Sequence, residues 1–136
     1  MIVDASVAFK WLVAESDSEQ AIAWIASGTT LSAPTLILAE IGHALTKRIR
    51  RAELSVEGAE ERFARLPSLI SLLDDASFVA RAFDLSIELR HAFYDCLYLA
   101  AAEGLDDQLL TADTVFAGKL SGHPLGGIVN VLGSTP

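Results

Sequence analysis

The chain has 136 residues, enough for one domain with a substantial core, and 51% of them are hydrophobic, so intrinsic disorder is excluded. The formal net charge of −8 disfavours broad electrostatic binding to nucleic acid. No segment approaches the roughly 18 uncharged apolar residues that span a bilayer. The N-terminus lacks the basic segment of a signal peptide, and the single cysteine, Cys96, cannot form an internal disulfide. We therefore expect a single domain over residues 1–136, in the cytoplasm and not in a membrane.

The chain begins with a predicted strand and two predicted helices. Residues 1–3 are a short apolar run, which is typical of a buried strand, and residues 5–13 have helical spacing. Ser16 and Glu19 have the spacing of a capping box, which predicts that a second helix follows Ser16.

A second strand and a long helix come next. Residues 30–33 predict the strand, and Pro34 suits the first turn of the helix that follows it. This helix has an apolar stripe and is expected to end near Arg51. Ser55 can cap a further helix.

The second half of the chain repeats this alternation. Apolar runs predict strands at 69–73, 108–111 and 128–131, and helical spacing covers 78–89, 94–103 and 115–120. Strands that alternate with helices favour an α/β fold in three layers, with a mainly parallel central sheet of four to five strands and helices on both faces.

Four acidic residues occupy positions that need an explanation. Asp4 follows the first predicted strand and Asp113 follows the strand at 108–111, and functional groups of open parallel sheets gather at the carboxyl ends of strands. Glu40 and Asp95 lie inside apolar helical segments, where an ionised carboxylate is costly unless it is paired or bound to a metal. Converging carboxylates repel one another, and a divalent cation removes that penalty. Mg²⁺ and Mn²⁺ prefer such oxygen ligands and can activate water for in-line attack on a phosphodiester.

Each of these positions also has a simpler structural interpretation. Asp4 and Asp113 could cap the helices that follow them. Ser6 and Thr111 could hydrogen-bond to nearby backbone. His43, one turn after Glu40, is more simply a helix-surface or core residue. The residue pattern assigns no role to His91 and His123.

The only dense basic run consists of Lys47, Arg48, Arg50 and Arg51. Its simpler interpretation is that it complements the C-terminal dipole of the long predicted helix on a solvated face. The alternative is a contact with RNA phosphates, which would partly offset the acidic surface.

Four short segments together resemble PIN-domain nucleases, and in particular the VapC-type toxins of bacterial toxin–antitoxin pairs. Each motif alone is weak, but the four occur in the expected order, and the resemblance extends from residue 2 to about residue 131. The segments are Val3-Asp4-Ala5-Ser6, Leu38-Ala39-Glu40-Ile41, Tyr94-Asp95-Cys96-Leu97-Tyr98-Leu99-Ala100 and Leu110-Thr111-Ala112-Asp113.

The resemblance implies a PIN-like fold and a ribonuclease that uses Mg²⁺ or Mn²⁺, forms a homodimer and is silenced by a small cognate antitoxin. It implies that a metal site is lined by Asp4, Glu40, Asp95 and Asp113, and that Ser6 and Thr111 help to orient these acids. Some relatives carry a further acid within one turn after the last of the four. Residues 114–117 contain none, so a second ion is expected to bind weakly or only with substrate.

Other functions fit less well. A catalytically silent RNA- or protein-binding module of the same fold remains the alternative. A haloacid-dehalogenase-type phosphatase would need an acid where Ser6 stands, and a receiver domain would need clustered acids near the first strand. Neither a Gly-x-Gly-x-x-Gly dinucleotide motif nor a serine-hydrolase elbow is present.

Overall fold

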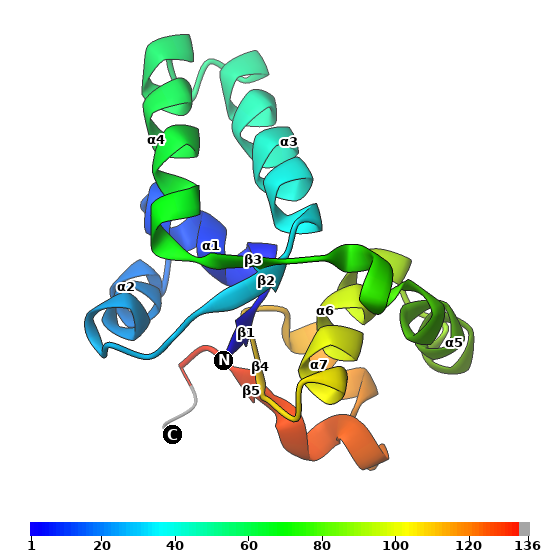
Figure 1. Ribbon diagram of the computed structural model, residues 1–136. Helices are drawn as coiled ribbons and strands as arrows, with labels where there is room; N and C mark the ends of the chain where they lie inside the picture. Colours follow the sequence, from blue (N-terminus) through cyan, green and yellow to red (C-terminus); the bar gives the residue numbers. More distant parts are fainter. Residues whose placement is uncertain (134–136) are drawn as a thin grey trace.

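A parallel five-stranded sheet runs through the centre of the computed structural model, which describes residues 1–133 (Figure 1). The strand order is β3-β2-β1-β4-β5, so the first strand lies in the middle. All four neighbouring pairs are parallel. The strands are β1 (Ile2–Val3), β2 (Ser32–Pro34), β3 (Ser71–Leu73), β4 (Leu109–Thr111) and β5 (Val129–Val131).

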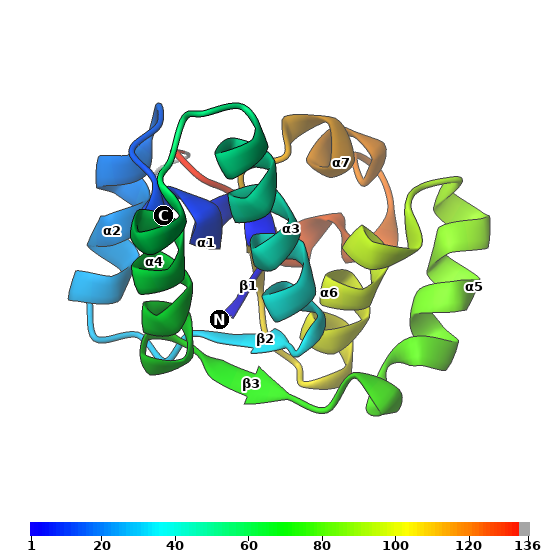
Figure 2. The ribbon, with the colours of Figure 1, turned by 90° about the horizontal axis from the view of Figure 1, so that it is seen from above.

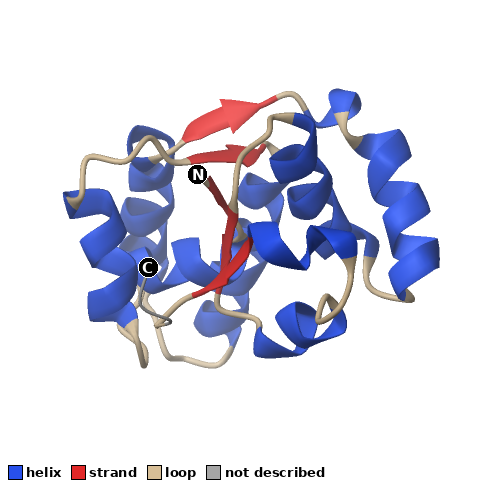
Figure 3. Ribbon diagram, turned by 90° about the horizontal axis from the view of Figure 1, so that it is seen from below, coloured by secondary structure: helices blue, strands red, loops and turns tan. Residues whose placement is uncertain are grey.

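Helices cover both faces of this sheet (Figure 3). The first four helices gather on one side, whereas α6 packs on the other side with α5 outside it (Figure 2). The helices are α1 (Ala5–Leu12), α2 (Ser18–Ala26), α3 (Leu36–Arg50), α4 (Val56–Leu69), α5 (Val79–Leu89), α6 (Phe93–Gly104) and α7 (Thr114–Lys119), with 3-10 turns η1 (Asp75–Ser77) and η2 (Pro124–Ile128). The expected three-layer α/β fold is confirmed.

The core lies where the two central strands meet α6. Both residues of β1 and the first two of β4 are almost completely buried, as is usual for parallel strands covered on both faces. Residues 96–102 of α6 are all buried, because this helix is enclosed between the sheet and α5. Within residues 1–133, no helix is long and apolar enough to cross a membrane.

The predicted capping box at Ser16 is wrong. Helix α2 begins at Ser18, and its N-cap residue is Asp17, which has a left-handed backbone with φ of 65°. The Ser18 hydroxyl accepts a hydrogen bond from the backbone N–H of Glu15 at 2.9 Å. This local turn takes the place of the box, and the Glu15 side chain turns instead to Arg48.

The predicted place of Pro34 in a helix is also wrong. Pro34 is the last residue of β2, paired in register with Leu73. Helix α3 begins two residues later, and Asp75 satisfies its first amide: the Asp75 carboxylate accepts from the Leu36 N–H and the Thr35 hydroxyl, both at 2.9 Å. Since Asp75 follows β3, this cap is a contact between distant parts of the sequence.

Candidate metal centre

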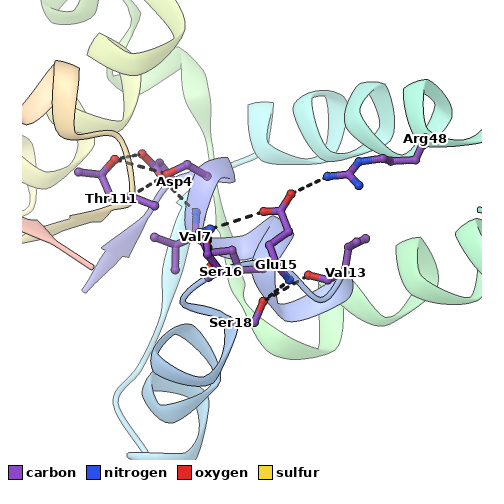
Figure 4. Close-up of polar contacts among 11 residues, drawn as sticks. Asp4, Val7, Val13, Glu15, Ser16, Ser18, Arg48 and Thr111 are labelled. Carbon is purple, nitrogen blue, oxygen red and sulfur yellow. Dashed lines mark hydrogen bonds and ion pairs between the residues drawn. The ribbon is translucent and has the colours of Figure 1, made fainter. Parts of the chain in front are cut away.

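Asp4 connects the end of β1 to the start of α1. Its Oδ1 accepts hydrogen bonds from the Val7 N–H at 3.2 Å and the Ser6 hydroxyl at 2.5 Å, and its Oδ2 accepts one from the Thr111 hydroxyl (Figure 4). The predicted cap is therefore present. Burial raises the pKa of Asp4 to about 6, although the bonds from Ser6 and Thr111 oppose the rise, and the nearby Asp95 carboxylate adds to it.

The hydroxyls of Ser6 and Thr111 join the ends of β1 and β4. The Ser6 oxygen also accepts from the Ala112 N–H at 2.8 Å, and the Thr111 oxygen accepts from the Asp113 N–H at 3.0 Å. Each hydroxyl therefore fixes the Asp4 carboxylate relative to the chain that leads to Asp113. Thr111 therefore bonds local backbone, as its simpler interpretation expected, whereas the backbone partner of Ser6 is 106 positions away in the sequence. Both hydroxyls also bond the Asp4 carboxylate.

Glu40 reaches the same region from α3. Its Oε1 accepts a hydrogen bond from the Tyr98 hydroxyl at 2.7 Å. Burial raises the pKa of Glu40, and the charges of Asp95 and Asp4 raise it further. Tyr98 lies one turn after Asp95 on α6 and is 1% exposed. Sequence reasoning missed Tyr98, although its spacing from Asp95 places both on one face of α6.

Asp95 and Asp113 form the most compact part of the cluster, together with His91. One ligand atom from each of these three residues lies within 4.8 Å of the other two. His91 Nε2 is 2.6 Å from Asp95 Oδ2. Asp113 caps α7 by accepting from the Phe116 N–H at 2.9 Å. Sequence reasoning gave His91 no role, because it lies before the first residue of α6.

The four acids converge, with Asp95 between the others. Its charge acts on Asp4 and Glu40, and its carboxylate is close to that of Asp113. Among residues 1–133, no Lys or Arg forms an ion pair with any of the four. A cluster of oxygen ligands without a cationic partner fits a divalent cation, which would offset the repulsion and the cost of burial.

The basic run at the end of α3 is split between two kinds of environment. Arg48 forms an ion pair with Glu15 at 2.6 Å (Figure 4). It forms a second ion pair with Glu53 at 2.9 Å, and its guanidinium lies 5.4 Å from the centre of the Phe9 ring. Lys47, Arg50 and Arg51 are exposed. Arg48 therefore ties α3 to neighbouring segments, and the other three cations face solvent.

Two hollows of about 410 Å³ each meet at Glu40. One lies between α1 and α3 and is lined by Ser6, Phe9 and Lys10 among others. The second lies between α3 and α6, where Leu36, Ala39, His43 and Tyr94 line it. Of the four acids, Glu40 lines both hollows, and Asp4, Asp95 and Asp113 line neither.

The family follows from comparison with known proteins. The model of the PIN domain matches residues 1–119. The chain belongs to the PIN-domain family. It is 35% identical to Ribonuclease VapC1 of Mycobacterium tuberculosis over 118 residues, 85% of this chain and 87% of that protein. It is 30% identical to Ribonuclease VapC3 of Pyrobaculum aerophilum over 122 residues, 88% of this chain and 93% of that protein.

Solved structures agree on the PIN fold. PAE2754 from Pyrobaculum aerophilum has a TM-score of 0.71 at 24% identity, and the match covers 87% of this chain and 84% of the PAE2754 chain. A toxin–antitoxin complex from Klebsiella pneumoniae has a TM-score of 0.66 at 17% identity, and the match covers 96% of this chain and 95% of that chain. VapBC2 from Rickettsia felis, bound to a promoter DNA fragment, has a TM-score of 0.70 at 14% identity, and the match covers 96% of each chain. At these identities the likeness concerns the fold.

Proposed function

We propose that this PIN-domain protein is an endoribonuclease that depends on Mg²⁺ or Mn²⁺ and serves as the toxin of a toxin–antitoxin pair. The observation that carries the proposal is the convergence of Asp4, Glu40, Asp95 and Asp113, with which no Lys or Arg of residues 1–133 forms an ion pair. Support for RNA as the substrate comes from two relatives named ribonucleases, each aligned over most of its length.

Each acid has a role in this proposal. Asp4, Asp95 and Asp113 would hold the ion, and Glu40 would complete the site directly or through water. The bound ion would supply activation of a water molecule and stabilisation of the leaving oxygen of an in-line displacement. Ser6 and Thr111 keep the Asp4 carboxylate fixed, which limits reorganisation during the reaction. Glu40, held by Tyr98 and with a raised pKa, is placed to accept the proton of the attacking water.

The hollow between α3 and α6, beside Glu40, suits a single strand of RNA. In the hollow between α3 and α6, the ring of Tyr94 is 57% exposed and offers a face on which a base can stack. Cleavage of single-stranded RNA follows from this arrangement more readily than cleavage of a duplex.

Replacing Asp4 or Asp95 by Asn tests the proposed chemistry. We expect each variant to lose at least about 100-fold in Mg²⁺- or Mn²⁺-stimulated cleavage of RNA and to keep the far-UV circular dichroism of the parent. Asp84→Asn, which changes an exposed acid of α5, is the matched control and should retain activity. Full activity in both site variants, or equal cleavage with and without a chelator, would refute the mechanism. Absence of cleavage of any RNA by the parent would favour the silent binding module.

The exposed end of α3 is the second proposed RNA contact. Lys47, Arg50 and Arg51 would bind phosphates, whereas Arg48 is already engaged by Glu15 and Glu53. Changing the three exposed cations to Gln should reduce the salt slope of RNA binding by about 0.7 for each lost phosphate contact. An unchanged slope would leave these side chains with the role of complementing the helix dipole.

A cognate antitoxin is the proposed protein partner. Two proteins with this fold were solved as a toxin–antitoxin complex and as VapBC2. The acid cluster, which pairs with no Lys or Arg of residues 1–133, offers a cationic side chain of an inhibitor a place to bind. We expect the small protein encoded beside this gene to co-purify with the chain and to relieve its toxicity. Expression of the chain alone without toxicity, and with RNA left intact, would argue against a toxin.

A homodimer is the proposed oligomeric state. Val79, Phe83 and Ile87 follow one another at intervals of four residues on α5 and are 42%, 60% and 64% exposed. This spacing places them on one face of the helix. A second copy of the chain would bury this apolar stripe by packing the same face against it.

A further inference from the structure

The tightest group of potential ligands in the acid cluster contains a histidine. The ligand atoms of His91, Asp95 and Asp113 lie within 4.8 Å of one another. Ligand atoms that bind one ion at about 2.1 Å can be at most about 4.2 Å apart. Side-chain shifts of a few tenths of an ångström would therefore bring all three onto a common ion.

The His91 ring is held in place from several directions. It stacks on Phe116, with 4.6 Å between ring centroids and 23° between planes. Its backbone N–H donates to the Ser86 carbonyl at 3.2 Å, and its carbonyl accepts from the Ser86 hydroxyl at 2.6 Å. Phe116 is 1% exposed and also donates its backbone N–H to Asp113. One residue therefore supports both the imidazole and a carboxylate of the group.

The imidazole is directed at the acids. Nε2 lies within hydrogen-bonding distance of Asp95 Oδ2, at 2.6 Å, so the nitrogen is beside a carboxylate proposed to bind the ion. The His91 side chain is 12% exposed, so the nitrogen is directed at the acids and not at solvent. The two other histidines lie elsewhere: His43 is an exposed residue of α3, and His123 pairs with Glu88.

We propose that His91 is a nitrogen ligand of the divalent ion, beside Asp95 and Asp113, and that it shifts the preference of the site from Mg²⁺ toward first-row transition ions such as Mn²⁺. The inference rests on the proposed function, because it concerns the ion of the same site. An all-oxygen site suits Mg²⁺, whereas imidazole is a better ligand for transition ions than for Mg²⁺. A histidine in the first coordination sphere therefore acts as a determinant of metal choice.

The competing interpretation is that His91 only positions Asp95 through a hydrogen bond. Side chains that hydrogen-bond to a metal-binding carboxylate are common in metal sites and tune the affinity for the ion without touching it. The two interpretations differ in one measurable property, which is a bond between the imidazole nitrogen and the metal.

The test uses Mn²⁺ bound to the full chain and measures nitrogen couplings by electron spin-echo envelope modulation. We expect the parent protein to show the coupling of a directly bound imidazole nitrogen. His91→Gln keeps a hydrogen-bond donor toward Asp95 and should lose the coupling. His91→Phe keeps an aromatic ring against Phe116 and should lose it as well. His123→Gln is the control and should retain it.

Affinity gives a second measurement that does not depend on catalysis. In both His91 variants the Kd for Mn²⁺ should rise by roughly 10- to 100-fold, and the Kd for Mg²⁺, measured by competition, should rise by less than about threefold. Mn²⁺ binding by the parent without a nitrogen coupling would overturn the inference while leaving the metal-dependent nuclease intact. Absence of Mn²⁺ and Mg²⁺ binding by the parent would overturn both.

Discussion

The carboxyl group of Asp4 is buried among hydrogen-bond donors, yet it keeps its proton to a higher pH than a solvent-exposed aspartate does. Its pKa rises from 3.8 to about 6, chiefly because burial penalises the charged form. Since the folded state binds this proton more tightly than the unfolded state, Asp4 makes the metal-free protein lose stability as pH rises from about 4 to about 6. A cation that binds the ionised form would offset that loss.

Asp4→Asn removes this titration. We expect the metal-free variant to match the parent near pH 4 and to exceed it in free energy of unfolding by as much as about 3 kcal/mol at pH 7.5, at about 1.4 kcal/mol for each pKa unit. Urea denaturation at the two pH values measures the difference. Asp84→Asn, at an exposed position, should show no such dependence. A variant that differs from the parent by the same amount at both pH values would contradict the assignment.

Tyr98 gives a second prediction at this scale. Its hydroxyl lowers the pKa of Glu40 against the effects of burial and of neighbouring acids. Tyr98→Phe removes this bond, so the pKa of Glu40 should rise and the acidic limb of the pH–rate profile should move to higher pH. A hydrogen bond to a charged group contributes about 1.5–3 kcal/mol, so at a given pH on the acidic limb the rate should fall by about tenfold or more. A reduced rate with an unmoved acidic limb would indicate a purely structural effect.

The sequence pointed to the four acids because strand ends and apolar helical segments both mark them. It also places Tyr98 on the same face of α6 as Asp95, but it does not reveal the partner of Tyr98, and it gives no role to His91. The bond from Tyr98 to Glu40 joins residues 58 positions apart, and no periodicity reports which helix faces meet. His91 lies between α5 and α6, so its spacing from Asp95 does not predict that its side chain points toward Asp95.

Helix α3, which carries Glu40, depends on a cap from another element. Asp75 accepts from the Leu36 amide and the Thr35 hydroxyl, and its charge lies at the positive end of the helix dipole. Asp75→Ala should lower the free energy of unfolding by about 0.5–2 kcal/mol. Asp74→Ala is the matched control, because Asp74 caps the short turn η1 through the Ala76 N–H. If urea denaturation gives the same decrease in the free energy of unfolding for the two variants, the Asp75 cap does not stabilise α3 more than Asp74 stabilises its short turn.

The order and type of the elements could be predicted, whereas two of their boundaries could not. Ser16 and Pro34 both matched local rules for helix starts. In the structure the first amide of α3 donates to Asp75, some 40 residues later, and local rules that consider only near neighbours cannot predict such a long-range cap. Before α2, the Glu15 amide donates to the Ser18 hydroxyl, a local turn that forms in place of the capping box.

At the scale of the whole molecule, the apolar stripe on α5 predicts association. Phe83→Glu places a charge in the middle of Val79, Phe83 and Ile87 and should convert a dimer to a monomer, because an unpaired buried charge is costly. Light scattering coupled to size exclusion measures the mass. Ile22→Glu changes a comparably apolar, 48% exposed residue of α2 and should leave the dimer intact. A monomeric parent, or equal masses for the parent and the Phe83 variant, would refute the proposal that this face of α5 is the dimer interface.

The position of β1 in the middle of the sheet has a consequence for synthesis. Asp4 leaves the ribosome first, but Thr111 and Asp113, which complete its surroundings, are translated about a hundred residues later. A nascent chain without β4 can pair β1 only with β2. The proposed nuclease site therefore comes into existence only near the end of translation. An incomplete chain released early carries the first two acids without the last two, and it is expected to be harmless to the cell that makes it.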